Sequence, residues 1–368
     1  MRTVLLNDFH AQWATIGEKI LSAAERVGKS GWYILGEEVK NFENHLAAHW
    51  GLNYAVGCAS GLDALEIGLR ALGITPGEKV LTTPLSAFAT TLAIIRAGGI
   101  PVFVDVDDSG LIDLALCEQA LEKYPEIRYF VPVHLYGQVL SYTKLSELKS
   151  KYDLKIVEDC AQAIGASSEG KTVGGVGSIA ATSFYPTKNL GCMGDGGALL
   201  TNEKILETKA RCIRDYGQSQ KYIHVELGLN SRLDELQAAI LDTLIPQLRT
   251  LTKRRKVIAF KYREKIRHSL IHFPSIPDGS DGVWHLFPLL VKENVEGFQN
   301  YLKSKNIQTG RHYPLLIPRQ TALQNFIEIA MMNKAQYFAE HEVSLPIHPF
   351  MVEEDIEHVI DACNTWMA

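Results

Sequence analysis

The sequence lacks the features that mark several broad classes of protein. Its 37 Lys and Arg residues are outnumbered by 42 Asp and Glu residues, a formal net charge of -5, so it offers no basic surface for nucleic acid. No continuous apolar run reaches the roughly 20 residues that span a bilayer. The opening stretch MRTVLLNDFHAQW is interrupted by Asp8 and His10 and lacks the apolar core of a signal peptide. We therefore expect a cytoplasmic protein that binds neither nucleic acid nor a membrane.

Metal-ligand motifs are missing as well. The six cysteines are scattered without a C-x-x-C pair, which indicates neither a zinc site nor a disulfide framework. His45 and His49 have i, i+4 spacing, but the motif HLAAH lacks the Glu of H-E-x-x-H, so we interpret them as histidines on a polar helix face. The basic run Lys253–Lys256 is interpreted as a solvated helix face. We predict no bound metal.

From Asn53 onward, short apolar β-branched runs alternate with helical patterns. Such alternation predicts an α/β fold with a mostly parallel sheet covered by helices on both faces. We expect strands at residues 54–59, 79–83, 101–106, 128–135 and 155–160, and helices at 60–73, 88–99, 113–124 and 144–152. Two further apolar runs follow at residues 180–185 and 197–201, and then a charged helix.

The organisation changes in the last third of the chain. A long helical pattern covers residues 231–266, and we expect Pro246 to break it. Beyond Ser269 the elements are mixed, which indicates a smaller α+β domain. We therefore predict a large α/β domain at residues 1–245 and a small carboxy-terminal domain at residues 246–368.

Several side chains with chemical potential fall at the carboxyl ends of expected strands, where open parallel sheets bind ligands. Ser60–Gly61 opens a helix whose free N–H groups suit an anion. Phe88 begins a helix after a strand, Asp159 ends the strand KIVEDC, and Lys188 follows the strand that ends at Ser183. Taken singly, each has an ordinary structural explanation: a helix cap, a core aromatic, a turn cap or a surface charge.

Together, these residues are the parts that hold pyridoxal phosphate. A lysine forms a Schiff base with the cofactor aldehyde and then moves protons. An acid keeps the pyridine nitrogen protonated, an aromatic ring stacks on the pyridine face, and the helix end binds the phosphate. The combination predicts a pyridoxal phosphate enzyme far more specifically than any single member.

Five motifs carry a resemblance to a known family. In order, they are SGLDAL, SAFATT, EDCAQAIGA, TSFYPTKNLGCMGDGGAL and GLNSRLDELQAAIL. This order resembles the DegT/StrS group of nucleotide-sugar aminotransferases over nearly the whole chain. The resemblance implies the aspartate-aminotransferase fold (fold type I) and a homodimer with active sites at the subunit interface.

The resemblance also implies residue roles. Lys188 would be the Schiff-base lysine and Asp159 the partner of the pyridine nitrogen. Gln162 would hydrogen-bond the ring hydroxyl, and Phe88 would stack on the ring. The remaining cofactor contacts would be Ser60, Gly61 and Ser183 at the phosphate, the backbone of Leu62 where most members have Thr, and Asn230 from the second subunit. By a less specific similarity to residues that contact the nucleotide sugar in family members, the sugar would be contacted by Tyr33, Tyr185, Lys221, His312 and Tyr313.

The resemblance narrows the substrate. GLDAL, GWYILG and RDYGQSQKYIH are similar to the subgroup that aminates C3 of dTDP-linked 3-keto-6-deoxyhexoses, with an amino acid, glutamate by resemblance, as donor. Amination at C4 stays open, because both ketones need the same cofactor machinery. The segment after HYP, LLIPRQ, departs from the family pattern and leaves the sugar contacts open.

Two alternatives come from other classes. A nucleotide-binding oxidoreductase would also show the α/β alternation, but it needs G-x-G-x-x-G after the first strand, and VGCASGLDAL lacks it. A non-catalytic sensor could keep the fold, although the complete lysine, aspartate and glutamine set argues against it. Related sugar 3-dehydratases carry His in place of the lysine, and Lys188 argues against that activity.

Overall fold

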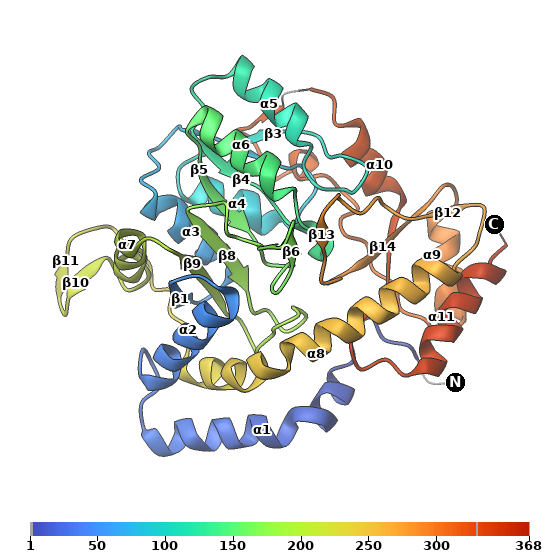
Figure 1. Ribbon diagram of the computed structural model, residues 1–368, viewed down its shortest axis with the longest axis horizontal. Coiled ribbons are helices and arrows are strands. Elements are labelled where there is room, and N and C mark those ends of the chain that lie inside the picture. Colours follow the sequence, from blue (N-terminus) through green and yellow to red (C-terminus); the bar gives the residue numbers. More distant parts are fainter. Residues whose placement is uncertain (1–2, 329, 368) are drawn as a thin grey trace.

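An eight-stranded sheet forms the centre of the computed structural model, which describes residues 3–328 and 330–367. The strand order is β1-β9-β8-β5-β4-β2-β3-β15, and among these strands β9 alone runs antiparallel to its neighbours (Figure 1). The strands are β1 (Tyr54–Cys58), β2 (Lys79–Thr82), β3 (Ile100–Phe103), β4 (Tyr129–Val131), β5 (Lys155–Asp159), β8 (Ile179–Ser183), β9 (Gly197–Thr201) and β15 (Ile327–Glu328). The predicted α/β fold with a mostly parallel sheet is confirmed.

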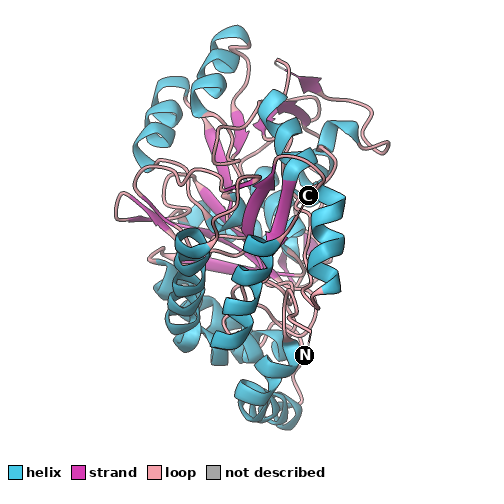
Figure 2. Cartoon of the chain, turned by 90° about the vertical axis from the view of Figure 1, so that its right-hand side faces the viewer, coloured by secondary structure: helices cyan, strands magenta, loops and turns pink. Residues whose placement is uncertain are grey.

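Helices cover both faces of this sheet (Figure 2). Alternate residues of a strand enter different hydrophobic clusters, as the two-residue period of a strand requires. On β5, Val157 packs with α3, α4 and α7, whereas Ile156 packs with α5, α6 and α10. Near β1 and β9 the second face is covered by α1, α2 and α8. The helices are α1 (Phe9–Ser30), α2 (Glu37–Trp50), α3 (Gly61–Ala71), α4 (Phe88–Arg96), α5 (Leu114–Lys123), α6 (Tyr142–Tyr152), α7 (Lys204–Arg214), α8 (Glu235–Lys265) and α10 (Asn333–His341).

The carboxy-terminal third builds a second core. Its antiparallel sheet has the order β12-β14-β16, with α9 and α11 packed in the same cluster. Val4 belongs to this cluster and pairs with Ile307, and Trp366 belongs to it as well, so described segments near both ends of the chain pack beside the small sheet (Figure 1). The elements are β12 (Ile271–His272), β14 (Phe287–Val291), β16 (Glu342–Leu345), α9 (Val295–Ser304) and α11 (Glu353–Thr365). Smaller elements are the sheet of β6 (Ser167–Ser168), β7 (Lys171–Thr172) and β13 (Ser280–Asp281), the hairpin of β10 (Gln218–Gln220) and β11 (Ile223–His224), and the 3-10 turns Leu135–Gly137 and Ile317–Arg319.

The predicted break at Pro246 is wrong, because α8 runs for 31 residues with this proline inside it. A proline in a helix removes one hydrogen bond and costs about 3 kcal/mol. Packing on both sides outweighs that cost. Leu244 and Leu248 are buried in the cluster of α1 and α2, and Tyr262 is buried in the cluster of the small sheet. The predicted division at residue 245 falls inside this helix and stays a proposal.

The solvated helix face expected at residues 253–256 is wrong for Arg255. Only 5% of this residue is exposed. Its Nη1 donates to the carbonyl oxygens of Ile347 at 2.8 Å, His285 at 3.4 Å and Trp284 at 3.5 Å, and burial lowers its pKa to about 10. The four-residue run therefore presents one arginine to the interior, because α8 is covered on more than one side. Among the described residues, no helix combines the length and apolar character of a membrane span.

Candidate active site

Lys188 and Asp159 meet at the carboxyl end of the large sheet. Asp159 is the last residue of β5, and Lys188 lies in the loop that follows β8, the strand paired with β5. The loop turns back on itself, with the Lys188 amide donating to the Tyr185 carbonyl at 2.8 Å. Parallel neighbouring strands thus bring together two residues that are 29 positions apart.

Asp159 is buried and has two hydrogen-bond donors. The Thr90 hydroxyl donates to Oδ2 at 2.8 Å and the Ala161 amide to Oδ1 at 3.1 Å. Burial raises the pKa of Asp159 above its usual value, while these bonds and the charge of Lys188 oppose the rise. A carboxylate in this state gains from any further cation or N–H donor that reaches it.

Lys188 lines a pocket of about 350 Å³. Burial lowers its pKa to about 8, and the charge of Asp159 only partly opposes this shift. A lysine with such a pKa has a substantial neutral fraction near neutral pH, which is the form that acts as nucleophile and base. The pocket is also lined by the polar side chains of Gln162, Tyr185, His285, His312 and Tyr313.

A narrow cradle lies at the amino end of α3. Ser60 caps this helix by accepting the Asp63 amide at 3.1 Å, and the amides of Gly61 and Leu62 in the first turn have no helical carbonyl to bind. A Cβ atom on Gly61 would lie 2.6 Å from Ser183 Cβ, and one on Gly197 would lie 2.3 Å from the Ser60 carbonyl carbon. Glycine at both positions keeps amides and hydroxyls open to a phosphate.

The residues around this cradle fit pyridoxal phosphate. Phe88 is half-buried at the start of α4, two residues before the Thr90 that holds Asp159. The Oε1 atom of Gln162 accepts the Tyr136 amide at 2.7 Å, and its Nε2 donates to the Tyr313 hydroxyl at 3.3 Å. Anion cradle, aromatic ring, buried acid and lysine are therefore present in one region.

Of the site residues named from the sequence, the described lining of the pocket includes Gln162, Tyr185, Lys188, His312 and Tyr313. Tyr33, Lys221 and Asn230 are instead exposed at the surface. Tyr33 is 59% exposed before α2, Lys221 lies in the exposed turn between β10 and β11, and Asn230 is exposed and paired with Asp215. The hairpin projects from the body of the chain (Figure 1). Leu62 is half-buried, and its side chain packs with the α3 cluster.

His285 is a pocket residue that sequence reasoning missed. The Asn189 amide nitrogen donates to the Val283 carbonyl at 3.2 Å, so Asn189 Oδ1 is left to accept from His285 Nδ1 at 3.2 Å. His285 Nε2 is then unprotonated. Burial and the charge of Lys188 lower the pKa of His285 far below its usual range. A histidine in the apolar run VWHLFPLLV was the available signal.

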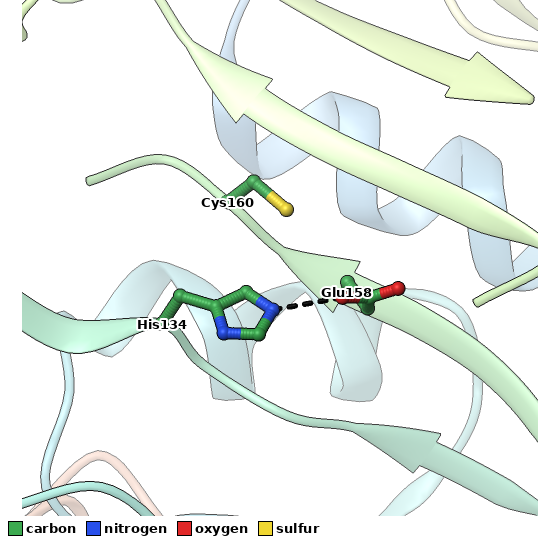
Figure 3. Close-up of side chains that lie close together, drawn as sticks. All are labelled: His134, Glu158 and Cys160. Carbon is green, nitrogen blue, oxygen red and sulfur yellow. Dashed lines mark hydrogen bonds and ion pairs between the residues drawn. The ribbon is translucent and has the colours of Figure 1, made fainter. Parts of the chain in front are cut away.

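His134, Glu158 and Cys160 form a buried group with metal-ligand chemistry (Figure 3). The ligand atoms of His134, Glu158 and Cys160 lie within 4.8 Å of one another. Glu158 accepts His134 Nε2 at 2.8 Å and the amides of Gly174, Val176 and Gly177 at 2.5–3.0 Å. These donors lower the pKa of Glu158 in spite of burial. Its oxygens are thus used in holding the loop 174–177 against β5.

Known proteins share this chain's sequence and fold. Residues 14–364 match the model of the DegT/DnrJ/EryC1/StrS aminotransferase family. A dTDP-3-amino-3,6-dideoxy-alpha-D-galactopyranose transaminase of Aneurinibacillus thermoaerophilus is 42% identical over 95% of each chain. A dTDP-3-amino-3,4,6-trideoxy-alpha-D-glucose transaminase of Streptomyces venezuelae is 38% identical over 98% of this chain and 95% of its own.

A solved structure agrees with these sequence matches. The crystal structure of S. venezuelae DesV superposes with a TM-score of 0.95 at 38% identity, covering 100% of this chain and 99% of its own. The expected aminotransferase class and cofactor are therefore confirmed, and the oxidoreductase and sensor alternatives are set aside. The chain belongs to the DegT/DnrJ/EryC1/StrS aminotransferase family, whose members use pyridoxal phosphate.

Proposed function

We propose that this aminotransferase moves an amino group from an amino acid, L-glutamate in our assignment, to C3 of a dTDP-3-keto-6-deoxyhexose. The observation that carries the reaction type is the electrostatic pairing of Lys188, which lines the pocket, with the buried carboxylate of Asp159. The glycine-lined amino end of α3 adds a cradle for a phosphate. The names of two relatives, both dTDP-3-amino sugar transaminases, support the choice of C3 over C4.

The residues of the chain have distinct roles in this proposal. Bound pyridoxal phosphate supplies an electrophilic carbon and a ring that accepts electrons. Lys188 would hold the cofactor, and its Nζ would then accept and return the proton of the reacting carbon. A pKa of about 8 suits both roles near neutral pH. Asp159 would pair with the ring nitrogen, Gln162 would orient the ring hydroxyl, and Ser60, Gly61, Leu62 and Ser183 would bind the phosphate.

The first test uses amino sugars as donors in the reverse half-reaction. We expect dTDP-3-amino-3,6-dideoxyhexose to change the absorbance of the bound cofactor, and the 4-amino isomer to leave it unchanged. A response to the 4-amino sugar alone would move the site of amination to C4. The variant Lys188→Ala serves as the negative control, because it cannot link the cofactor covalently or turn over.

The proposal also includes a cytoplasmic location and a homodimer in which each active site is built from both subunits. Exposed apolar side chains on the hairpin and the following loop support it: Tyr222, Ile223, Val225 and Leu227 are 53–92% exposed. Asn230 and Lys221 lie outside the pocket of their own chain and would complete the pocket of the second subunit, as would Tyr33.

Mixing two inactive variants tests the shared site. Lys188→Ala and Asn230→Ala damage different subunits of one site, so a mixed dimer keeps one intact site. We expect re-associated equimolar mixtures to recover about a quarter of wild-type activity. A monomer in sedimentation velocity, or a mixture that stays inactive after exchange of labelled subunits, would contradict shared sites.

A further inference from the structure

Two buried side chains, Glu342 and Ser344, and the half-buried His312 form a hydrogen-bonded chain that ends in the active-site pocket. Glu342 and Ser344 lie two residues apart on β16, 1% and 0% exposed, so their side chains share one face of the strand. The Ser344 hydroxyl donates to Glu342 Oε1 at 2.5 Å, and His312 Nδ1 lies 2.8 Å from Ser344 Oγ. His312 lines the pocket that also contains Lys188.

The position of His312 is fixed from several sides. Its backbone N–H donates to Glu342 Oε2 at 2.6 Å, and the Tyr136 hydroxyl donates to its carbonyl oxygen at 2.7 Å. Gly310 leaves room for the ring, because a Cβ atom there would lie 2.7 Å from His312 Cε1. The imidazole is therefore held at one end of the chain Glu342–Ser344–His312.

The direction of the hydrogen bonds follows from the carboxylate. An ionised Glu342 only accepts, so the Ser344 proton points to it and the Ser344 oxygen accepts from His312 Nδ1–H. His312 Nε2 then carries a lone pair. It makes no hydrogen bond to any residue that the structure describes, and it belongs to a pocket-lining side chain.

The two ends of the chain differ in basicity. Burial and the charge of Lys188 lower the pKa of His312 to about 4, so the imidazole alone is a weak base. Burial raises the pKa of Glu342 to about 7. The hydrogen bonds from Ser344 and the His312 amide, together with the charge of Arg311, partly oppose this rise. Tyr136 and Tyr313 also face this group, whereas β14, the strand paired with β16, has the sequence FPLLV and no titratable side chain.

We propose that Glu342, Ser344 and His312 form a proton relay that deprotonates the ammonium group of the incoming amino donor. The donor's N–H bond breaks, and the electron pair stays on nitrogen, ready to attack the cofactor. The proton goes to His312 Nε2, the Nδ1 proton goes to Ser344 Oγ, and the Ser344 proton goes to Glu342 Oε1. The same steps in reverse return the proton to the amino group of the product. This inference rests on the proposed use of the pocket by an amino donor.

The relay is tested with Glu342→Gln, which keeps the size and an acceptor oxygen but cannot take up the proton. The readout is the single-turnover reaction of the cofactor-loaded enzyme with L-glutamate between pH 6 and 9.5. We expect a rate about 100-fold lower than wild type at pH 7. The deficit should shrink as pH rises, because the donor then arrives as free amine. Glu340→Gln, an exposed neighbour on α10, should leave both the rate and the profile unchanged.

If the rate of Glu342→Gln stays below wild type by the same factor at every pH, the relay is overturned. A purely structural role of Glu342 predicts such a constant factor. A wild-type rate in Glu342→Gln would overturn it as well. Failure of the proposed function is separate, because wild type itself would then not react with amino donors.

A second measurement does not depend on turnover or on the glutamine variant alone. Infrared difference spectra of the apoenzyme between pH 6 and 8 should show one carboxyl titrating near pH 7. That signal should be absent in Glu342→Gln and moved to higher pH in Ser344→Ala, which removes one hydrogen bond to the carboxylate. A spectrum identical in wild type and both variants would overturn the relay.

Discussion

Glu158 and Asp159 are neighbours in sequence, yet their carboxylates lie on opposite faces of β5 in different hydrogen-bonding surroundings. Both are buried, with 2% and 5% exposed. Glu158 accepts four hydrogen bonds from His134 and the loop 174–177, and its pKa is lowered. Asp159 accepts two and its pKa is raised. The number of donors, rather than burial, separates the two.

The difference teaches which carboxylate is available for chemistry. A buried carboxylate with a full set of donors has no capacity for another partner, and its removal leaves several buried amides unpaired. One with an incomplete set is destabilised until a cationic ligand arrives. The period of the strand places these two roles on adjacent residues.

The largest effect should come from Asp159→Asn. Under the proposed role of Asp159 as partner of the cofactor ring, loss of its negative charge should lower kcat about 100- to 1000-fold, while the fold survives. Steady-state kinetics with a matched thermal melt measure both. A variant with near wild-type kcat would remove Asp159 from the reaction.

The reverse pattern is expected for Glu158→Gln. Breaking a buried pair should lower the free energy of unfolding by about 3 kcal/mol, because the amide group offers a donor where the carboxylate offered an acceptor. Activity per folded molecule should stay close to wild type at low temperature. Urea unfolding followed by fluorescence provides the value, and an equal loss of activity in the two variants would end the distinction.

The comparison also predicts opposite dependences on pH in the apoenzyme. The lowered pKa of Glu158 means that its stabilisation is present above about 4.5 and is lost as pH falls through its folded pKa. The raised pKa of Asp159 means that its ionised form destabilises the fold above that pKa, with no effect below about 3.8. At pH 7 Glu158→Gln should therefore be less stable than wild type and Asp159→Asn more stable. The Asp159 difference should disappear as pH falls towards about 3.8, whereas the Glu158 difference should start to shrink only below about 4.5.

The smallest effect should come from Thr90→Val. Loss of one hydrogen bond to Asp159, worth about 1.5 kcal/mol with a charged acceptor, should lower kcat about tenfold. Thr90→Ser keeps the hydroxyl and should retain most of the activity. Equal rates for the two variants would mean that this bond does not tune the carboxylate.

Local patterns predicted much of this molecule. The alternation of strands and helices predicted the sheet, because each strand identifies itself by a short apolar run. The end of KIVEDC and the loop after TSFY likewise placed Asp159 and Lys188 at one edge, since parallel strands bring their carboxyl ends together.

Features that depend on distant contacts were not predictable in this way. Pro246 stays helical and Arg255 is buried only because α8 packs on two cores. The chain from Glu342 to His312 joins residues 30 positions apart, and neither HYP nor HEVSLP reveals that their side chains meet. The register of β16 and the loop before it determine that contact.

Val4 carries a consequence for the order in which the molecule is assembled during synthesis. The cluster around the small sheet unites Val4 with residues of α8, β14, β16 and α11, up to Trp366. A ribosome releases the chain from its amino end, so the large sheet can gather its strands while this cluster still lacks its last members. Val4 therefore cannot reach its final packing until α11 and Trp366 have been synthesised, and the small core closes after the large sheet has formed.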